Sequence, residues 1–595
     1  MFKRTSLLIA ILLLVSISLF AGGMELTAED IALRGFRSVG EALSSLAGVE
    51  VQSYYGNSAL VTVSINGSKG SQVDVYVDGI RQTRDYDGTF NLGLIALSRV
   101  ESISVDADRG LGGSVYITTR RSASGEVSVL NNSLLAENDS ADDSDRYFNG
   151  QNVSAYYGGS SNGSGYAIGA SYNRDMTAHR IASSSDRTEV DDYAVDGSYS
   201  YSTERGSIGL SARYSQNDAD TMGSTSWVSN TNTKTIIGGF TVNGDYRLES
   251  GLLLKGSLGW QYKAYEYTPY VVSLYDPASH NKTNVFEFDF RAGNSGNGRR
   301  LSCSFGINGT ETMVQASSIG DHNRFNVGVV ADISYLLAGE FLFAIDARVP
   351  LNEESEGSVE GSITWYADRA TETAVKLKVG YSLAQPNLSA LYWPVDYTMY
   401  YEGNPDLDPE KVFSASIGLD SRPLRNLKYS GSIFIRHTTD LLAYVTDPLT
   451  YMGSYDNVDE ALFIGSNQSI STVIREHLSL EASATINYTY NLSGDNDIFD
   501  KVRVNNVRMH TLKLATGYVS KTISIIGDVQ FLGGYYYNSA KQHADTLYGL
   551  TVNFSPAESV TLSARLENIF DEDYFLYQGY PMPGTNLTLK STLRF

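Results

Sequence analysis

The stretch VDVYVDGIRQTRDYDGTFNLGLIALSRVESISVDADRGLGGSVYITTRR, residues 73–121, predicts three short strands joined by turns. Apolar residues alternate with polar ones around Val75 and again around Val115. An alternation with a period of two is typical of a strand that buries one face. Asp78-Gly79 and Gly112-Gly113 mark turns, because glycine readily adopts the left-handed backbone that tight turns need. We therefore expect a small sheet here.

The residues before this sheet extend it into a compact α+β domain. A short extended segment at Met24–Thr27 leads into a helical turn, and Ser38–Leu46 shows the apolar spacing of a second helix. Ser38 followed by Glu41 three residues later predicts a capping box at the start of that helix. With two further strands near residues 50 and 63, the sequence predicts one domain over residues 24–121.

From residue 122 to the C-terminus the sequence repeats one pattern of alternating residues and turns. Tyr193–Tyr201 and Ile208–Tyr214, for example, alternate on either side of a turn at Ser202–Gly206. Longer polar segments separate these hairpins, for example 136–147, 217–232, 384–409, 439–457 and 571–584. The short turns are expected near 158–164, 202–206, 249–251, 292–298, 336–340, 367–372, 422–426, 473–478, 519–522 and 555–559.

Short turns that alternate with long loops indicate an antiparallel transmembrane β-barrel. Ten short turns and eleven longer loops predict about 22 strands over residues 122–595, in a chain that is mostly β. The last strand alternates up to Phe595, as closure of a barrel requires. A secreted β-helix or sandwich array is the alternative, but the sequence shows no short fixed repeat.

The N-terminus predicts export. Lys3 and Arg4 precede the apolar run Leu7–Phe20, and Ala21–Gly23 offers small residues for cleavage. This run is too short to span a membrane as a helix, so residues 1–23 are predicted to be a signal peptide. The net charge of −22 argues against a nucleic-acid partner, because such a partner needs a basic surface.

The sequence shows no catalytic or cofactor motif. Its seven histidines have no metal-ligand spacing, and the single cysteine, Cys303, excludes an internal disulfide. We therefore expect no enzymatic activity and no required cofactor. Acidic clusters in the first two long loops could supply the oxygen ligands that calcium takes, although clusters of this kind are more often simply solvated acidic loops. The candidate calcium ligands are Asp139, Asp142, Asp143, Asp186 and Asp191.

Aromatic residues are concentrated in the long segment 384–409. Such rings stack on flat ligands, but they also form the aromatic girdle of a membrane barrel. These candidate ligand-binding residues are Tyr392, Trp393, Tyr397, Tyr400 and Tyr401.

Several motifs in the expected order resemble the TonB-dependent outer-membrane receptors, and in particular their cobalamin and siderophore branch. In the N-terminal domain they are Ser38–Leu43 with Ala47-Gly48-Val49, Val77–Ile80, Arg99–Ile103 and Gly112–Thr118. In the barrel they are Gly403–Glu410, Asn568–Asp571 with Tyr574, Gly584 and the terminal Phe595.

This resemblance implies that the domain at 24–121 is a plug inside the lumen of a barrel in the outer-membrane lipid. It implies uptake of a scarce iron or corrinoid ligand, driven by proton-motive force through TonB of an inner-membrane complex. Calcium orders the outer loops of some cobalamin receptors in this family.

The chain also departs from the family pattern. The predicted signal peptide runs almost directly into Glu25, Leu26, Thr27 and Ala28, with no separate TonB-contacting box before them. Either these four residues contact TonB, or the barrel is an uncoupled passive channel or surface ligand-binding protein. The plug segment beside Gly110 is about ten residues shorter than is usual in the family, and Thr585 stands where the family has arginine.

Overall fold

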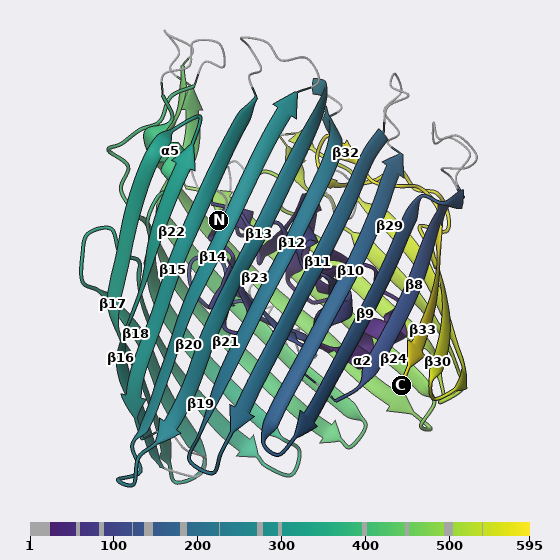
Figure 1. Ribbon diagram of the computed structural model, residues 1–595, viewed down its shortest axis with the longest axis horizontal. Helices are drawn as coiled ribbons and strands as arrows, with labels where there is room; N and C mark the ends of the chain where they lie inside the picture. The colour runs from purple at the N-terminus through teal and green to yellow at the C-terminus, as the bar shows by residue number, and fades with distance from the viewer. Residues whose placement is uncertain are drawn as a thin grey trace, which may run out of the picture.

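The structure is a computed structural model in which a closed barrel of 22 antiparallel strands surrounds an N-terminal plug (Figure 1). This confirms the predicted fold class. The structure describes residues 24–54, 60–82, 88–121, 123–135, 147–178, 187–224, 227–269, 278–294, 300–394, 401–446, 452–492, 504–537 and 540–595. The predicted signal peptide lies outside these residues and stays a prediction.

No helix among the described residues is both long and apolar enough to cross a bilayer.

The barrel strands pair in chain order, and the last strand closes the barrel on the first. Asn586 pairs with Leu134 and Arg594 with Glu126, so no strand edge is left open to lipid. The strands are β8 (Gly125–Leu134), β9 (Gly150–Ser161), β10 (Ser164–Ala178), β11 (Arg187–Ser202), β12 (Gly206–Ser224), β13 (Trp227–Arg247), β14 (Leu253–Pro269), β15 (Ser279–Gly293), β16 (Leu301–Ala316), β17 (Gly320–Leu337), β18 (Phe341–Pro350), β19 (Gly357–Asp368), β20 (Thr373–Ala384), β21 (Glu410–Leu424), β22 (Leu427–Thr446), β23 (Gly453–Ile474), β24 (Leu478–Asn491), β25 (His510–Val519), β26 (Ile523–Leu532), β29 (Asp545–Ala557), β30 (Val560–Glu567) and β33 (Asn586–Arg594).

The two rims of the barrel differ. All ten predicted short turns join consecutive strands at one rim, which we call the short-turn rim, and the long connections lie at the opposite, long-loop rim (Figure 1). The predicted loops at 217–232 and 439–457 are wrong in extent, because β12, β13, β22 and β23 continue through most of them. These strands extend beyond the bilayer. Their outer segments, such as residues 217–221, are mostly polar, so no apolar alternation marks them.

Short secondary-structure elements lie at the long-loop rim. They are helix α5 (Leu388–Tyr392) and the hairpins β27 (Tyr536–Tyr537) with β28 (Ala540–Lys541) and β31 (Phe575–Tyr577) with β32 (Tyr580–Pro581).

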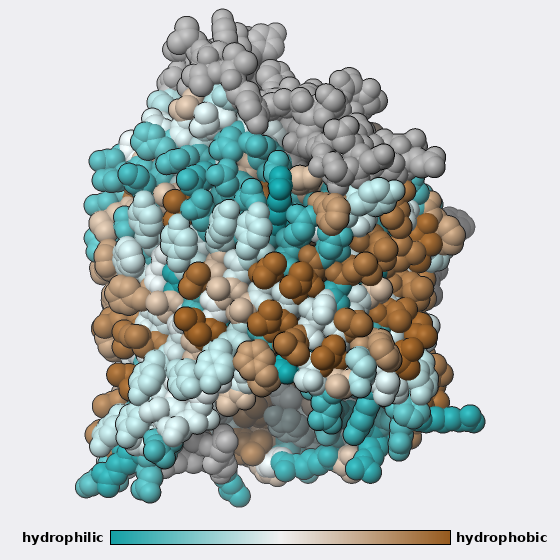
Figure 2. Space-filling view, turned by 45° about the vertical axis from the view of Figure 1, so that its right-hand side comes forward, coloured by the Kyte–Doolittle hydropathy of each residue, from teal (hydrophilic) through white to brown (hydrophobic). Residues whose placement is uncertain are grey.

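The barrel surface has the polarity that lipid requires. Outward residues such as Ile208 and Leu210 are large, apolar and exposed, whereas inward residues such as Thr551 and Arg565 are polar and buried. Figure 2 shows the apolar residues as a band at mid-height, between polar rims. An apolar band around a polar interior is what a transmembrane barrel presents to the bilayer.

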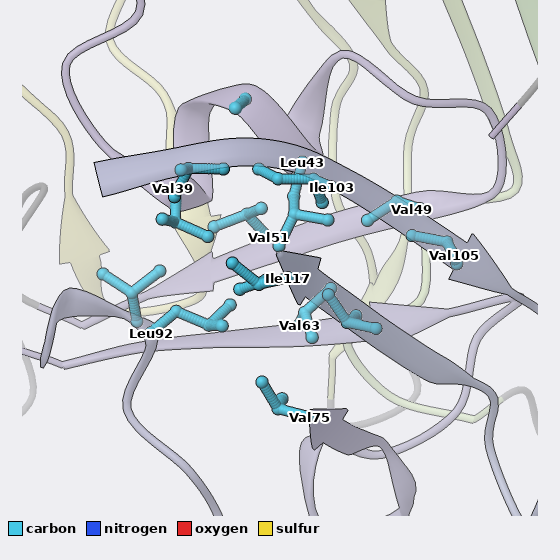
Figure 3. Packing of buried hydrophobic residues seen from close by; sticks show 14 of the residues in the cluster. Val39, Leu43, Val49, Val51, Val63, Val75, Leu92, Ile103, Val105 and Ile117 are labelled. Atoms are coloured by element: carbon cyan, nitrogen blue, oxygen red, sulfur yellow. The ribbon is translucent and has the colours of Figure 1, made fainter. Parts of the chain in front are cut away.

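The plug is an α+β domain with its own core. Its five-stranded sheet has the order β1-β6-β7-β4-β5, and β2 and β3 form a separate hairpin. Val39 and Leu43 from α3 pack with Val51, Ile103 and Ile117 from the strands (Figure 3). The elements are β1 (Glu25–Thr27), α2 (Ala28–Arg34), α3 (Val39–Ser44), β2 (Val49–Ser53), β3 (Val61–Ile65), β4 (Asp74–Val77), β5 (Ile80–Arg81), β6 (Val100–Asp106) and β7 (Ser114–Thr119), with 3-10 turns η1 (Gly70–Gln72), η2 (Leu92–Leu94) and η3 (Leu97–Arg99).

Helix capping differs from the prediction in one detail. Ser38 caps α3 by accepting a hydrogen bond from Glu41 N at 3.1 Å, as expected. The Glu41 carboxylate, however, accepts from Arg37 N at 2.7 Å, so only half of the predicted box forms. A complete capping box is found instead between Thr27 and Asp30 at the start of α2.

Candidate functional site

A chamber of about 250 Å³ separates the plug from the barrel wall near the long-loop rim. Barrel strands β15–β17 and β20–β23, the segment around α5 and three plug loops enclose it. Its polar lining comes from inward positions near the strand ends, because side chains alternate across each strand. The charged lining residues are Lys69, Arg81, Glu287, Arg324, Glu356 and Glu410.

Some of these charges are already paired. Arg81 on the plug lies 2.9 Å from Asp74 Oδ1 and 2.5 Å from Glu356 Oε2 on the barrel. Burial works to lower the pKa of Arg81, but Glu356 outweighs it, and the pKa is raised. Lys69 Nζ donates to the Leu442 carbonyl at 2.7 Å. These contacts attach the plug to the wall and do not hold a ligand.

Two charged groups of the chamber remain open to a ligand. Glu287 Oε2 is buried and has no hydrogen-bond partner. Within the described part of the chain, Arg324 makes neither a hydrogen bond nor an ion pair, although it lies in the field of Glu354 and Glu356. Leaving a buried polar atom unpaired costs about 1–3 kcal/mol, so a ligand that satisfies these groups would be favoured.

Those predicted aromatic residues that the structure describes lie beside this chamber. Tyr392 at the end of α5 stacks on His322, with ring centroids 4.0 Å apart. Trp393 meets Tyr401 at 5.6 Å, and Tyr401 meets Tyr455 at 6.3 Å, both edge to face.

Of this aromatic cluster, only Tyr455 lines the chamber itself. Tyr392 is 41% exposed, Trp393 is also accessible, and Tyr397 and Tyr400 lie outside the described residues. His322 and Tyr455 were missed, because no local pattern links residues so distant in the chain.

The predicted plug turns are present, but their four residues do not line the chamber. Asp78 and Gly79, with φ of 51° and 84°, form the left-handed turn between β4 and β5. Gly113 has φ of 96°. A Cβ atom at Gly112 would lie 2.6 Å from Ser68 Cβ, so this position needs glycine for close packing.

Comparison with known families decides the identity of this plugged barrel. The model described as "TonB-dependent Receptor Plug Domain" matches residues 24–116, and "TonB dependent receptor-like, beta-barrel" matches residues 129–569. The chain belongs to the TonB-dependent receptor family. It is therefore an outer-membrane receptor and transporter, not an enzyme. Its long-loop rim faces the outside and its short-turn rim the periplasm.

Similar proteins agree with this assignment. The vitamin B12 transporter BtuB of Vibrio vulnificus (strain YJ016) is 25% identical over 197 residues, which cover 33% of this receptor and 30% of that transporter. The ferric enterobactin receptor of Pseudomonas aeruginosa has a TM-score of 0.79 at 15% identity, covering 97% of this chain and 100% of that chain. The siderophore receptor PirA of Acinetobacter baumannii scores 0.77 at 13% identity, covering 98% and 99%. Such low identities establish the fold alone.

The predicted TonB segment is part of the folded plug. Glu25, Leu26 and Thr27 form β1, and Ala28 begins α2. Strand β1 is an outer strand of the plug sheet, paired with β6 along one edge. Val105 N on β6 donates to Met24 O at 2.9 Å, so the backbone groups of Met24 point towards β6. Because backbone groups of successive residues point to opposite sides of a strand, the N–H of Glu25 points away from β6, towards the outer edge of β1.

Most of the predicted calcium ligands cannot be placed. Asp139, Asp142, Asp143 and Asp186 lie outside the described residues. Asp191 lies on β11 and accepts a hydrogen bond from Tyr172 Oη at 2.6 Å. The described residues contain no group of three potential metal ligands, and calcium binding stays a prediction.

Ion pairs between plug and barrel form a second set of residues that the sequence does not reveal. They join the receptor's plug to the wall on several sides, so the plug interface is polar rather than apolar. The pairs are Arg34–Glu481, Arg37–Glu567, Arg81–Glu356, Arg99–Asp196 and Asp106–Lys378.

Proposed function

We propose that this receptor takes up a corrinoid or a ferric siderophore, coupled to proton-motive force through TonB. The observation that carries the proposal is the chamber, in which the open groups of Arg324 and Glu287 lie between the plug and the aromatic cluster. A cationic and an anionic group suit a ligand with several polar substituents, while the rings beside them suit a flat or aromatic one.

The matched proteins support both ligand classes. One is named as a vitamin B12 transporter, and another is in complex with enterobactin. Stacking on Tyr392, Trp393 or Tyr401 would serve a corrin ring as well as a catechol. The charge of Arg324 favours an anionic ligand, which the ferric siderophores include.

Coupling to TonB is the second part of the proposal. The outer edge of β1 offers the Glu25 N–H to an added strand, and β-strand addition is a common mode of peptide recognition. The competing function is that of an uncoupled passive channel or surface ligand-binding barrel. It is favoured because Glu25–Ala28 are part of β1 and α2, so the described residues contain no separate TonB-contacting segment ahead of the plug.

Three measurements test the proposal. Cells that depend on this receptor should grow on limiting corrinoid or on limiting ferric siderophore, and uptake should stop when an uncoupler collapses the proton-motive force. The receptor in detergent should also retain the periplasmic domain of TonB in a pull-down. Uptake that resists the uncoupler, together with no TonB binding, would establish the uncoupled function instead. Failure to bind either ligand would reject the ligand classes.

A further inference from the structure

A narrow slot runs between the plug and the part of the barrel wall where the barrel closes. It has a volume of about 130 Å³ and is lined on the wall side by strands β8–β12, β29, β30 and β33. Figure 1 shows β8, β9, β30 and β33 side by side at this seam, as their pairing requires. Small or uncharged polar side chains dominate the wall, including Ser128, Asn132, Ser171, Ala194, Ser563 and Thr592.

The slot continues into a wider mouth at the short-turn rim. This mouth has a volume of about 490 Å³ and lies between α2 and the ends of β8, β26, β29, β30 and β33. Slot and mouth share lining residues, among them Arg120, Glu126 and Arg594, so the two spaces adjoin there. Together they follow β8 from Gly125 to Asn132, roughly 20 Å along the strand. Because barrel strands tilt by about 35–45°, this length corresponds to roughly 15 Å of the roughly 25 Å height of the apolar band.

A three-residue ion-pair cluster lies where the slot meets the mouth. Glu126 on β8 lies 3.2 Å from Arg120 at the end of the plug and 3.2 Å from Arg594 on β33. Arg594 also donates to Thr561 Oγ1 at 3.1 Å. Glu126 therefore holds two guanidinium groups close together, one from the plug and one from the barrel wall, at the point where the slot meets the mouth. We call these three residues the seam gate.

The charges around the seam gate are unequal. Glu126 is the single carboxylate of the gate, whereas Arg120 and Arg594 are cations, and Lys590 lines the slot beside them. The whole slot is lined by five cationic side chains and three carboxylates, because Arg37, Arg174, Asp175 and Asp192 also face it. Neutralising Glu126 would release the two guanidinium groups from their shared partner and raise the cationic excess of the lining from two charges to three. Glu29 and Glu101 line the wider mouth, where salt screens their charges.

We propose that the slot is a second conduit of this receptor, which passes small inorganic anions along the barrel seam when the seam gate opens. The conduit does not require the plug to leave the barrel and does not depend on TonB or on the transported nutrient. Movement of Arg120 with the plug would open the gate. The receptor would then conduct ions as well as bind its large ligand.

The test is single-channel recording in planar bilayers with the full chain and potassium chloride as the probe. Glu126→Gln should raise the mean current about tenfold, the change that a loss of about 1.4 kcal/mol makes in an equilibrium. The reversal potential in a salt gradient should show preference for chloride. An unchanged current, or preference for potassium, would overturn the proposal.

The matched control breaks a plug–barrel ion pair elsewhere. Asp196 pairs with the plug's Arg99 and does not line the slot. Asp196→Asn should leave the current at the wild-type level, and an equal increase would mean that the Glu126 variant merely loosens the plug.

A second variant places a bulky side chain in the slot. Adding Ala194→Trp to Glu126→Gln should return the current to the wild-type level, with thermal unfolding as the check on folding. If that variant does not fold, Ala194→Cys replaces it, in a chain whose only cysteine is removed by Cys303→Ser. A charged thiol reagent should then block the current of the Glu126→Gln form, and persistence of the current would reject the slot as its route.

Discussion

The carboxylate of Glu50, on plug strand β2, accepts a hydrogen bond from the backbone N–H of Arg508 at 3.3 Å. The Arg508 side chain in turn donates to the carbonyls of Gly533 at 3.0 Å and Phe575 at 2.6 Å. Glu50 of the plug thereby contacts Arg508, whose hydrogen bonds link its own long connection to the two that contain Gly533 and Phe575. This contact makes the attachment of the plug sensitive to pH.

Plug stability should fall as the pH rises through 7. Burial raises the pKa of Glu50 to about 7, and the attraction of Arg508 only partly offsets it. A carboxyl group whose folded pKa exceeds its unfolded value of about 4.3 stabilises the fold fully only below that value. This stabilisation is lost as the pH passes the folded pKa. Thermal unfolding in detergent should therefore give a lower Tm at pH 8 than at pH 5.

Glu50→Gln should reduce this difference in Tm by about 2 °C or more, because the amide does not ionise. Glu101→Gln, on the exposed side of β6, is the matched control and should leave the profile unchanged. A profile of Glu50→Gln that matches the wild type would contradict the assignment to Glu50.

Two glycines of the plug turns should differ in their tolerance of alanine. At Gly112 the added methyl group would lie 2.6 Å from Ser68 Cβ and 2.8 Å from Gln72 Cβ, so the backbone has to shift. Gly79 has φ of 84° but no atom within 4 Å of an added Cβ.

We expect Gly112→Ala to cost about 1–3 kcal/mol through overpacking and Gly79→Ala about 1–2 kcal/mol through backbone strain alone. Protease digestion of the plug in the intact receptor measures the difference. The Gly112 variant should be cut faster, and equal rates would show that close packing at Gly112 is unimportant.

Arg324→Ala should weaken the binding of an anionic ferric siderophore. A hydrogen bond to a charged group contributes about 1.5–3 kcal/mol, which isothermal titration calorimetry resolves as a change in Kd. Arg422→Ala is the matched control, because Arg422 pairs with Glu372 at the short-turn rim. Should Arg324→Ala leave Kd unchanged, the chamber does not hold the anionic part of the ligand.

Glu25→Pro should abolish TonB binding while Glu25→Ala preserves it. Proline removes the N–H that β1 presents at its outer edge, but it leaves the pairing of Leu26 with Ile103 in place. A pull-down with the periplasmic domain of TonB compares the two variants. If the proline variant still binds, TonB recognises another part of the plug.

The barrel was predictable because each part of its signal is local. Ile208 and Leu210 face lipid at alternate positions, and Ser202–Gly206 turns the chain between two such strands. Each hairpin carries this information within a few tens of residues, so the ten turns and 22 strands follow without long-range contacts. The extra length of β13 and β23 was not predictable, because strands above the bilayer lose the apolar face that marks them.

The chamber was predictable only in part. The aromatic residues around α5 stand together in the sequence, and Tyr392 and Trp393 do lie beside the chamber. Arg324 and Glu287 carry no sequence signal, because each is one charged residue among the polar, inward positions of a strand.

The sequence by itself determined the plug-and-barrel architecture, since strand period, turn length and barrel closure are properties of neighbouring residues. Only the tertiary structure decided which lumen residues meet the plug. Arg99 reaches Asp196, Glu50 reaches Arg508, and Arg120 and Arg594 meet at Glu126. Arg120 lies only six residues from Glu126, but the other partners lie far apart in the chain, and strand register together with the rotation of the plug inside the barrel sets their pairing. The chamber, the plug contacts and the seam gate all depend on that long-range packing.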